Sequence, residues 1–120
     1  MILVDDHLLA AHIGGSRGVG PEGGELATTC SWWWRLALAI NRRGGPPFAV
    51  DDLQMSITVP ERGRLLPSMT RLSDAYRLNV LAAEALAAAE LLGADILVAQ
   101  DTPRLREACR VRGVTYLVRI

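Results

Sequence analysis

Short apolar runs, each bounded by polar residues, alternate along this chain with longer segments that have helical spacing. Runs of a few Val, Ile and Leu residues are typical of strands buried in a parallel sheet. One run differs, because its apolar residues alternate with Gln, Ser and Thr, which is the period of a half-buried strand. The pattern predicts strands over residues 1–4, 53–59, 96–99 and 114–118.

The longer segments between these runs are expected to be helices. Ser73 or Asp74 can cap the start of a long Ala-rich helix, which Gly93 ends. Pro103 suits the first turn of the last helix, and Pro67 offers a break within an earlier one. The pattern predicts helices over residues 6–13, 26–40, 64–72, 75–92 and 103–112.

The order of these elements predicts the fold class. Strands that alternate with helices favour an α/β fold whose sheet is mainly parallel and whose crossovers are right-handed. The predicted sheet has four strands. Because the chain has 120 residues, of which 50% are hydrophobic, we expect a single domain over residues 1–120 with one core.

The charge balance, the cysteines and the apolar stretches of the chain argue against several classes of protein. Lys+Arg and Asp+Glu both number 13, so no global basic field attracts nucleic acid, although every basic residue is Arg and can form local phosphate sites. Cys30 and Cys109 lack the spacing of a metal site, which predicts free thiols in a reducing compartment. No apolar stretch is long enough to span a bilayer and no signal peptide is recognisable, so we expect a cytoplasmic protein without membrane contact.

Acidic residues follow two of the predicted strands. Asp5 and Asp6 come after the strand at 1–4, and Asp101 comes after the strand at 96–99. Ligand groups in open α/β sheets gather at the carboxyl ends of the strands, so we expect Asp5 to lie beside Asp101. Crowded carboxylates repel unless a cation lies among them, and their oxygens suit Mg²⁺ or Mn²⁺. The alternative is that Asp6 and Asp101 only cap the helices that follow.

A glycine-rich segment at residues 13–20 resembles the phosphate-binding motif of short-chain dehydrogenases. That motif follows a strand and opens a helix, whereas this segment follows a predicted helix and precedes Pro21. The segment is therefore predicted to be a loop, and a nucleotide-binding motif stays the less favoured alternative.

Three adjacent tryptophans, Trp32, Trp33 and Trp34, lie in a predicted helix. Successive residues point in different directions around a helix, so the three indoles cannot share one face. We expect at least one of them to lie at an interface or under a lid.

Several segments, taken in order, resemble the PIN-domain family, and in particular the VapC-type ribonucleases of toxin–antitoxin pairs. ILVD at residues 2–5 resembles the family's opening strand with its first metal-binding Asp, and ITVPE at residues 57–61 resembles its second strand. LNVLAAEAL at residues 78–86 resembles the segment that carries an acid near the start of the long helix. GADILVAQD at residues 93–101 resembles the late strand with its closing Asp, and residues 104–105 and 113–114 complete that pattern.

This resemblance implies a three-layer sandwich and a metal-dependent endoribonuclease that acts as a toxin. In such enzymes metal ions hold the scissile phosphate and a hydroxide for in-line attack. The resemblance gives Asp5, Glu84 and Asp101 the catalytic role and adds Asp6 as a further ligand of Mg²⁺ or Mn²⁺. RNA would be the substrate, and a cognate antitoxin or a second copy of the chain would be the protein partner.

The chain departs from the family pattern at its acids. Arg35 or a neighbouring Trp stands where the family has its second acid. Ala82 stands where it has its third, with Glu84 two residues further on, and Ala99 replaces the Thr of the last motif. A short loop at residues 41–52 replaces the usual helix pair. These departures predict a weak or inactive enzyme, and the alternative function is a PIN-like module without catalysis that binds RNA or a partner protein.

Overall fold

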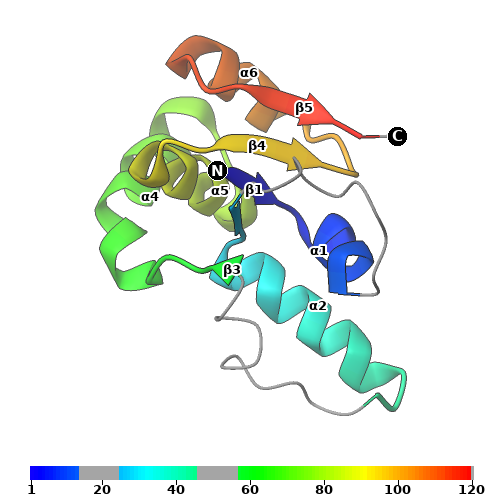
Figure 1. Ribbon diagram of the computed structural model, residues 1–120. Helices are drawn as coiled ribbons and strands as arrows, with labels where there is room; N and C mark the ends of the chain where they lie inside the picture. Colours follow the sequence, from blue (N-terminus) through cyan, green and yellow to red (C-terminus); the bar gives the residue numbers. More distant parts are fainter. Residues whose placement is uncertain (14–24, 46–56, 120) are drawn as a thin grey trace.

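A parallel sheet forms the centre of the molecule. The computed structural model describes residues 1–13, 25–45 and 57–119. Its sheet has five strands in the order β3-β2-β1-β4-β5, and every neighbouring pair is parallel (Figure 1). The strands are β1 (Ile2–Val4), β2 (Leu26–Ala27), β3 (Ile57–Thr58), β4 (Asp95–Val98) and β5 (Tyr116–Val118).

Helices cover both faces of this sheet, as expected for strands whose successive side chains point to opposite faces. Leu3 and Ile96 pair across β1 and β4 and belong to a core cluster shared with α4, α5 and α6. Val4 and Leu26 belong to a second cluster shared with α1 and α2. The helices are α1 (Asp6–Ile13), α2 (Cys30–Arg42), α4 (Arg62–Tyr76), α5 (Val80–Leu92) and α6 (Pro103–Arg112).

The prediction of a four-stranded sheet is wrong, because Leu26 and Ala27 form β2 instead of the first turn of a helix. The helix begins only at Cys30, where Thr29 is extended at φ −99° and ψ 160° and its hydroxyl accepts a hydrogen bond from the Trp32 N–H. A two-residue strand is too short to show a period of two. Its apolar residues could therefore not be distinguished from those of the apolar helix that follows.

The predicted helix at 75–92 is wrong at its start. Residues 73 and 74 lie inside α4, which runs through Pro67 to Tyr76. The chain then turns at Arg77, which has a left-handed φ of 55°. The side chain of Asn79 caps α5 by accepting a hydrogen bond from the Ala82 N–H at 2.9 Å. A left-handed turn is usually marked in the sequence by glycine. Because Arg occupies this one, the sequence did not indicate that one helix ends and another begins here.

Other expected elements are confirmed within a few residues: helices 6–13 and 103–112 have the predicted bounds, the strands at 1–4 and 114–118 are present but shorter, and the strand at 96–99 begins and ends one residue earlier. Of the strand expected at 53–59, residues 57 and 58 form β3, and residues 53–56 lie outside the described part of the chain. The glycine-rich segment from residue 14 onward lies outside it as well. No helix in the described ranges combines the length and apolar character needed to cross a membrane.

Candidate functional site

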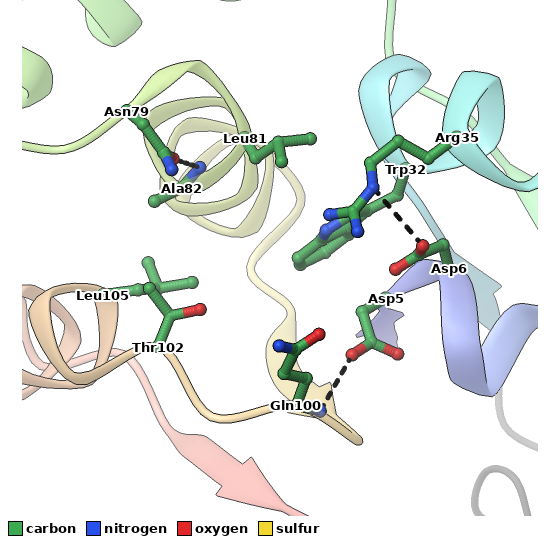
Figure 2. A pocket seen from close by; sticks show the side chains of 10 residues that line it. All are labelled: Asp5, Asp6, Trp32, Arg35, Asn79, Leu81, Ala82, Gln100, Thr102 and Leu105. Atoms are coloured by element: carbon green, nitrogen blue, oxygen red, sulfur yellow. Dashed lines mark hydrogen bonds and ion pairs between the residues drawn. The ribbon is translucent and has the colours of Figure 1, made fainter.

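The carboxyl ends of β1 and β4 lie side by side, because Val4 pairs with Leu97 in the parallel register. This arrangement brings Asp5 next to the residues that follow β4. A pocket of about 170 Å³ opens at this edge of the sheet between α1, α2, α5 and the start of α6 (Figure 2). It is lined by Asp5, Asp6, Trp32, Arg35, Asn79, Leu81, Ala82, Gln100, Thr102 and Leu105.

Asp5 is only 3% exposed, and both of its carboxylate oxygens accept backbone hydrogen bonds. Oδ1 accepts from the Leu8 N–H at 2.9 Å, which caps α1. Oδ2 accepts from the N–H groups of Ala99 at 2.9 Å and Gln100 at 3.3 Å, just after β4. Asp5 therefore joins the start of α1 to the end of β4, and three donors compensate its buried charge.

Asp6 has a cationic partner inside the pocket. Nε of Arg35 lies 3.6 Å from Oδ2 of Asp6. Figure 2 shows the guanidinium group of Arg35 reaching from α2 toward this carboxylate. A positive charge thus already occupies the position beside Asp6 where a metal ion would be attracted.

Asp101 follows β4 as predicted but does not line the pocket. It forms a salt bridge with Arg106, and its Oδ1 accepts a hydrogen bond from the Tyr116 hydroxyl at 3.0 Å. The same hydroxyl accepts from the Thr102 N–H at 2.9 Å. Burial of the phenol, together with the hydrogen bond to Asp101, raises the pKa of Tyr116 to about 12. These contacts hold residues 101–102, which lie between β4 and α6, against β5.

Glu84 lies away from the pocket, buried completely between α5 and the start of α2. Its Oε1 accepts a hydrogen bond from the Ser31 N–H at 3.3 Å and lies 3.8 Å from Nε of Arg62. Its Oε2 is buried and has no hydrogen-bond partner in the described part of the chain. Glu84 acts as a second cap of α2, beside Thr29, and ties α5 to that helix.

The acids present do not fit a two-metal centre. Asp5 and Asp6 share the pocket with Arg35 and with Ala82, which offers no ligand where the family pattern has an acid. Asp101 and Glu84 make separate contacts elsewhere. Within residues 1–13, 25–45 and 57–119, no three His, Cys, Asp or Glu side chains are grouped so that they could hold one metal ion.

The tryptophans divide between core and surface. Trp32 and Trp33 are buried, one in each core cluster. Trp34 is 62% exposed, and whether it lies at an interface stays a prediction. The sequence argument about helical faces thus accounts for the one indole that points outward.

A second cavity of about 710 Å³ adjoins the pocket and shares Asn79, Ala82 and Thr102 with it. Arg77 and Arg104 lie on its wall, and Nη1 of Arg104 donates to the Arg77 carbonyl at 3.2 Å. We refer to the two adjoining cavities as the groove. The sequence analysis did not predict that Arg77 and Arg104 line a groove. The available signals were Asn79 and the Thr-Pro pair at residues 102–103, which are typical of helix starts and mark where α5 and α6 begin.

No protein-family model and no curated protein matches the chain. Its function therefore has to be inferred from the residues of the groove.

Proposed function

We propose that this protein is a PIN-like domain that binds single-stranded RNA in the groove without cleaving it. The observation that carries the proposal is that Asp5 and Asp6 already have partners within the protein, Asp6 through Arg35, while two further arginines, Arg77 and Arg104, line the groove. The proposal thus favours the binding module over the ribonuclease that the family resemblance implies.

Charge in the groove supports an anionic ligand. Among the described residues, the groove is lined by two acids, Asp5 and Asp6, and by three arginines, Arg35, Arg77 and Arg104. Asp5 accepts backbone hydrogen bonds and Asp6 pairs with Arg35, so Arg77 and Arg104 are the charged side chains at the other end of the described groove. Guanidinium groups bind phosphate through paired N–H donors, which suits the backbone of a nucleic acid strand.

Polar and apolar side chains in the pocket suit an unpaired base. Trp32, Leu81 and Leu105 supply apolar surface, and the side chains of Gln100 and Thr102 point into the pocket (Figure 2). Single-stranded RNA presents base edges for such hydrogen bonds, whereas the bases of a duplex are stacked and paired. The pocket of about 170 Å³ is small, so we expect it to hold one base while the wider cavity holds the adjoining backbone.

Arg104→Ala is expected to weaken RNA binding several-fold and to lower the salt slope, because each phosphate contact to a single strand contributes about 0.7 to that slope. Fluorescence anisotropy of a labelled single-stranded RNA at several salt concentrations measures both quantities. Arg64→Ala, an exposed arginine on α4 outside the groove, is the matched control and should leave affinity and slope unchanged. Equal losses from Arg64→Ala and Arg104→Ala would show that binding does not use the groove.

The combined variant Arg35→Glu with Ala82→Asp should raise Mn²⁺ affinity by about 10–100-fold, because it removes the internal cation and places two further carboxylates in the pocket beside Asp5 and Asp6. Electron paramagnetic resonance of unbound Mn²⁺ measures the affinity. Arg64→Glu repeats the Arg-to-Glu part of this change outside the groove and should have no effect. If the wild-type protein bound Mn²⁺ as tightly as the double variant, Arg35 and Ala82 could not be what weakens metal binding beside Asp5 and Asp6.

A further inference from the structure

One carboxylate and one guanidinium group lie side by side on the wall of the pocket, and both can still bind a ligand. Nε of Arg35 lies 3.6 Å from Oδ2 of Asp6, which is longer than a hydrogen bond between such groups. The side chain of Arg35 is 41% exposed and that of Asp6 is 13% exposed. A pair at this distance leaves guanidinium donors and carboxylate lone pairs available for further hydrogen bonds.

The two side chains present different hydrogen-bonding groups to the pocket. Because Nε of Arg35 faces Asp6, the terminal nitrogens Nη1 and Nη2 remain as a fork of two donors. The carboxylate of Asp6 supplies two acceptor oxygens. Figure 2 shows Arg35 reaching from α2 and Asp6 from the start of α1, with the side chain of Gln100 on the other side of the pocket. One wall of the pocket thus offers a pair of acceptors beside a pair of donors.

We propose that Asp6 and Arg35 make the pocket selective for guanine, an inference that rests on the proposed binding of single-stranded RNA. Guanine has two adjacent donors, N1–H and the N2 amino group, which match the two oxygens of a carboxylate. Next to them it has two adjacent acceptors, O6 and N7, which match a guanidinium fork and are the commonest specific contact of arginine with a base. The bases of a single strand expose both edges.

The other bases match this pair of side chains less well. Adenine has one donor group between two acceptors, uracil has one donor between two acceptors, and cytosine has one donor group beside its acceptors. Each of them leaves an oxygen of Asp6 or a donor of Arg35 unpaired when it fills the pocket. An unpaired polar group in a binding site costs affinity.

The surroundings of the pair strengthen this selection. Trp32 and Leu105 line the same pocket and are buried, so a base that lies against them excludes water from part of its surface. Hydrogen bonds are stronger and unpaired polar groups more costly where water is excluded. The wider cavity, with Arg77 and Arg104, takes the adjoining phosphate.

A heptamer of uridine with one central guanosine should bind at least about fivefold more tightly than heptamers with adenosine, cytidine or uridine at that position, because a good bidentate contact discriminates bases by about this factor or more. Fluorescence anisotropy at constant salt measures the dissociation constants. Two analogues test the two contacts separately, since 7-deazaguanosine lacks the N7 acceptor and inosine lacks the N2 amino group. Each analogue should bind the wild-type protein more weakly than guanosine does.

Two variants assign these contacts to their residues. Arg35→Lys keeps the charge but has no fork, so it should bind the guanosine and 7-deazaguanosine strands with nearly equal affinity. Asp6→Asn keeps the shape but has one acceptor oxygen, so it should no longer distinguish guanosine from inosine. Arg64→Lys and Asp74→Asn make the same changes on α4 outside the groove and should keep both wild-type ratios. Circular dichroism shows that each variant is folded.

Equal affinity of the wild-type protein for all strands, or a preference for another base, would overturn the guanine site and leave the proposed RNA binding in place. A preference for guanosine that both Arg35→Lys and Asp6→Asn retain in full would overturn the roles of these two residues. If the wild-type protein bound none of the strands, the proposed function itself would fail, and the guanine site with it.

Discussion

Asp5→Ala is expected to lower the free energy of unfolding by about 2–4 kcal/mol, the largest loss from any single substitution at the sheet edge. The substitution removes the cap of α1 and leaves the N–H groups of Ala99 and Gln100 without their acceptor. Since Asp5 is almost completely buried, water does not readily replace the lost oxygens. Urea unfolding followed by tryptophan fluorescence measures the change.

Asp5→Asn is the matched variant, because its amide oxygen can keep one of the two sets of contacts while its amide nitrogen cannot accept the other. We expect it to lose about half as much stability as Asp5→Ala. If Asp5→Ala instead stabilised the protein, Asp5 would be an acid held at a cost in stability for a functional reason, as in an active nuclease.

Glu84→Ala is expected to cost about 2–3 kcal/mol, because the buried Ser31 N–H loses its acceptor and the deleted side chain leaves a cavity between α5 and α2. Much of the Arg62 contribution is screened by solvent, since that side chain is 45% exposed. The same urea experiment measures the loss.

Glu90→Ala is the control, because Glu90 lies on the same helix but forms an exposed salt bridge with Arg112. Surface pairs of this kind contribute about 0–1 kcal/mol. Equal losses at Glu84 and Glu90 would contradict the role of Glu84 as a buried cap of α2.

The edge of the sheet at which the pocket opens could be predicted from the strand ends, but of the four predicted acids only Asp5 and Asp6 line that pocket. Asp5 follows β1 and Asp101 follows β4, and parallel pairing of these strands brings both acids to one edge of the sheet. Asp5 has a local partner in Leu8 and Asp101 in Arg106, but the other partners of Asp5 and those of Glu84 could not be predicted, because they come from residues far along the chain. Ala99 reaches Asp5 across 94 positions, and Ser31 reaches Glu84 across 53.

The fold was predicted where elements carry strong local signals and was missed where they do not. Pro103 and Gly113 frame α6, and its predicted bounds are confirmed. The turn at Arg77 has no such signal, so α4 and α5 were divided at the wrong place. This part of the groove could not be predicted either, because Arg77 and Asn79 line it only as a result of the turn.

The most direct test of the central claim is incubation of a labelled single-stranded RNA with the purified protein in the presence of Mn²⁺, compared with the same mixture in EDTA. One sample is analysed for RNA length and another for the fraction bound. We predict that the RNA stays intact in both conditions and that EDTA leaves the bound fraction unchanged, because the groove arginines hold it without metal. Mn²⁺-dependent cleavage that EDTA abolishes would contradict this account and support a ribonuclease.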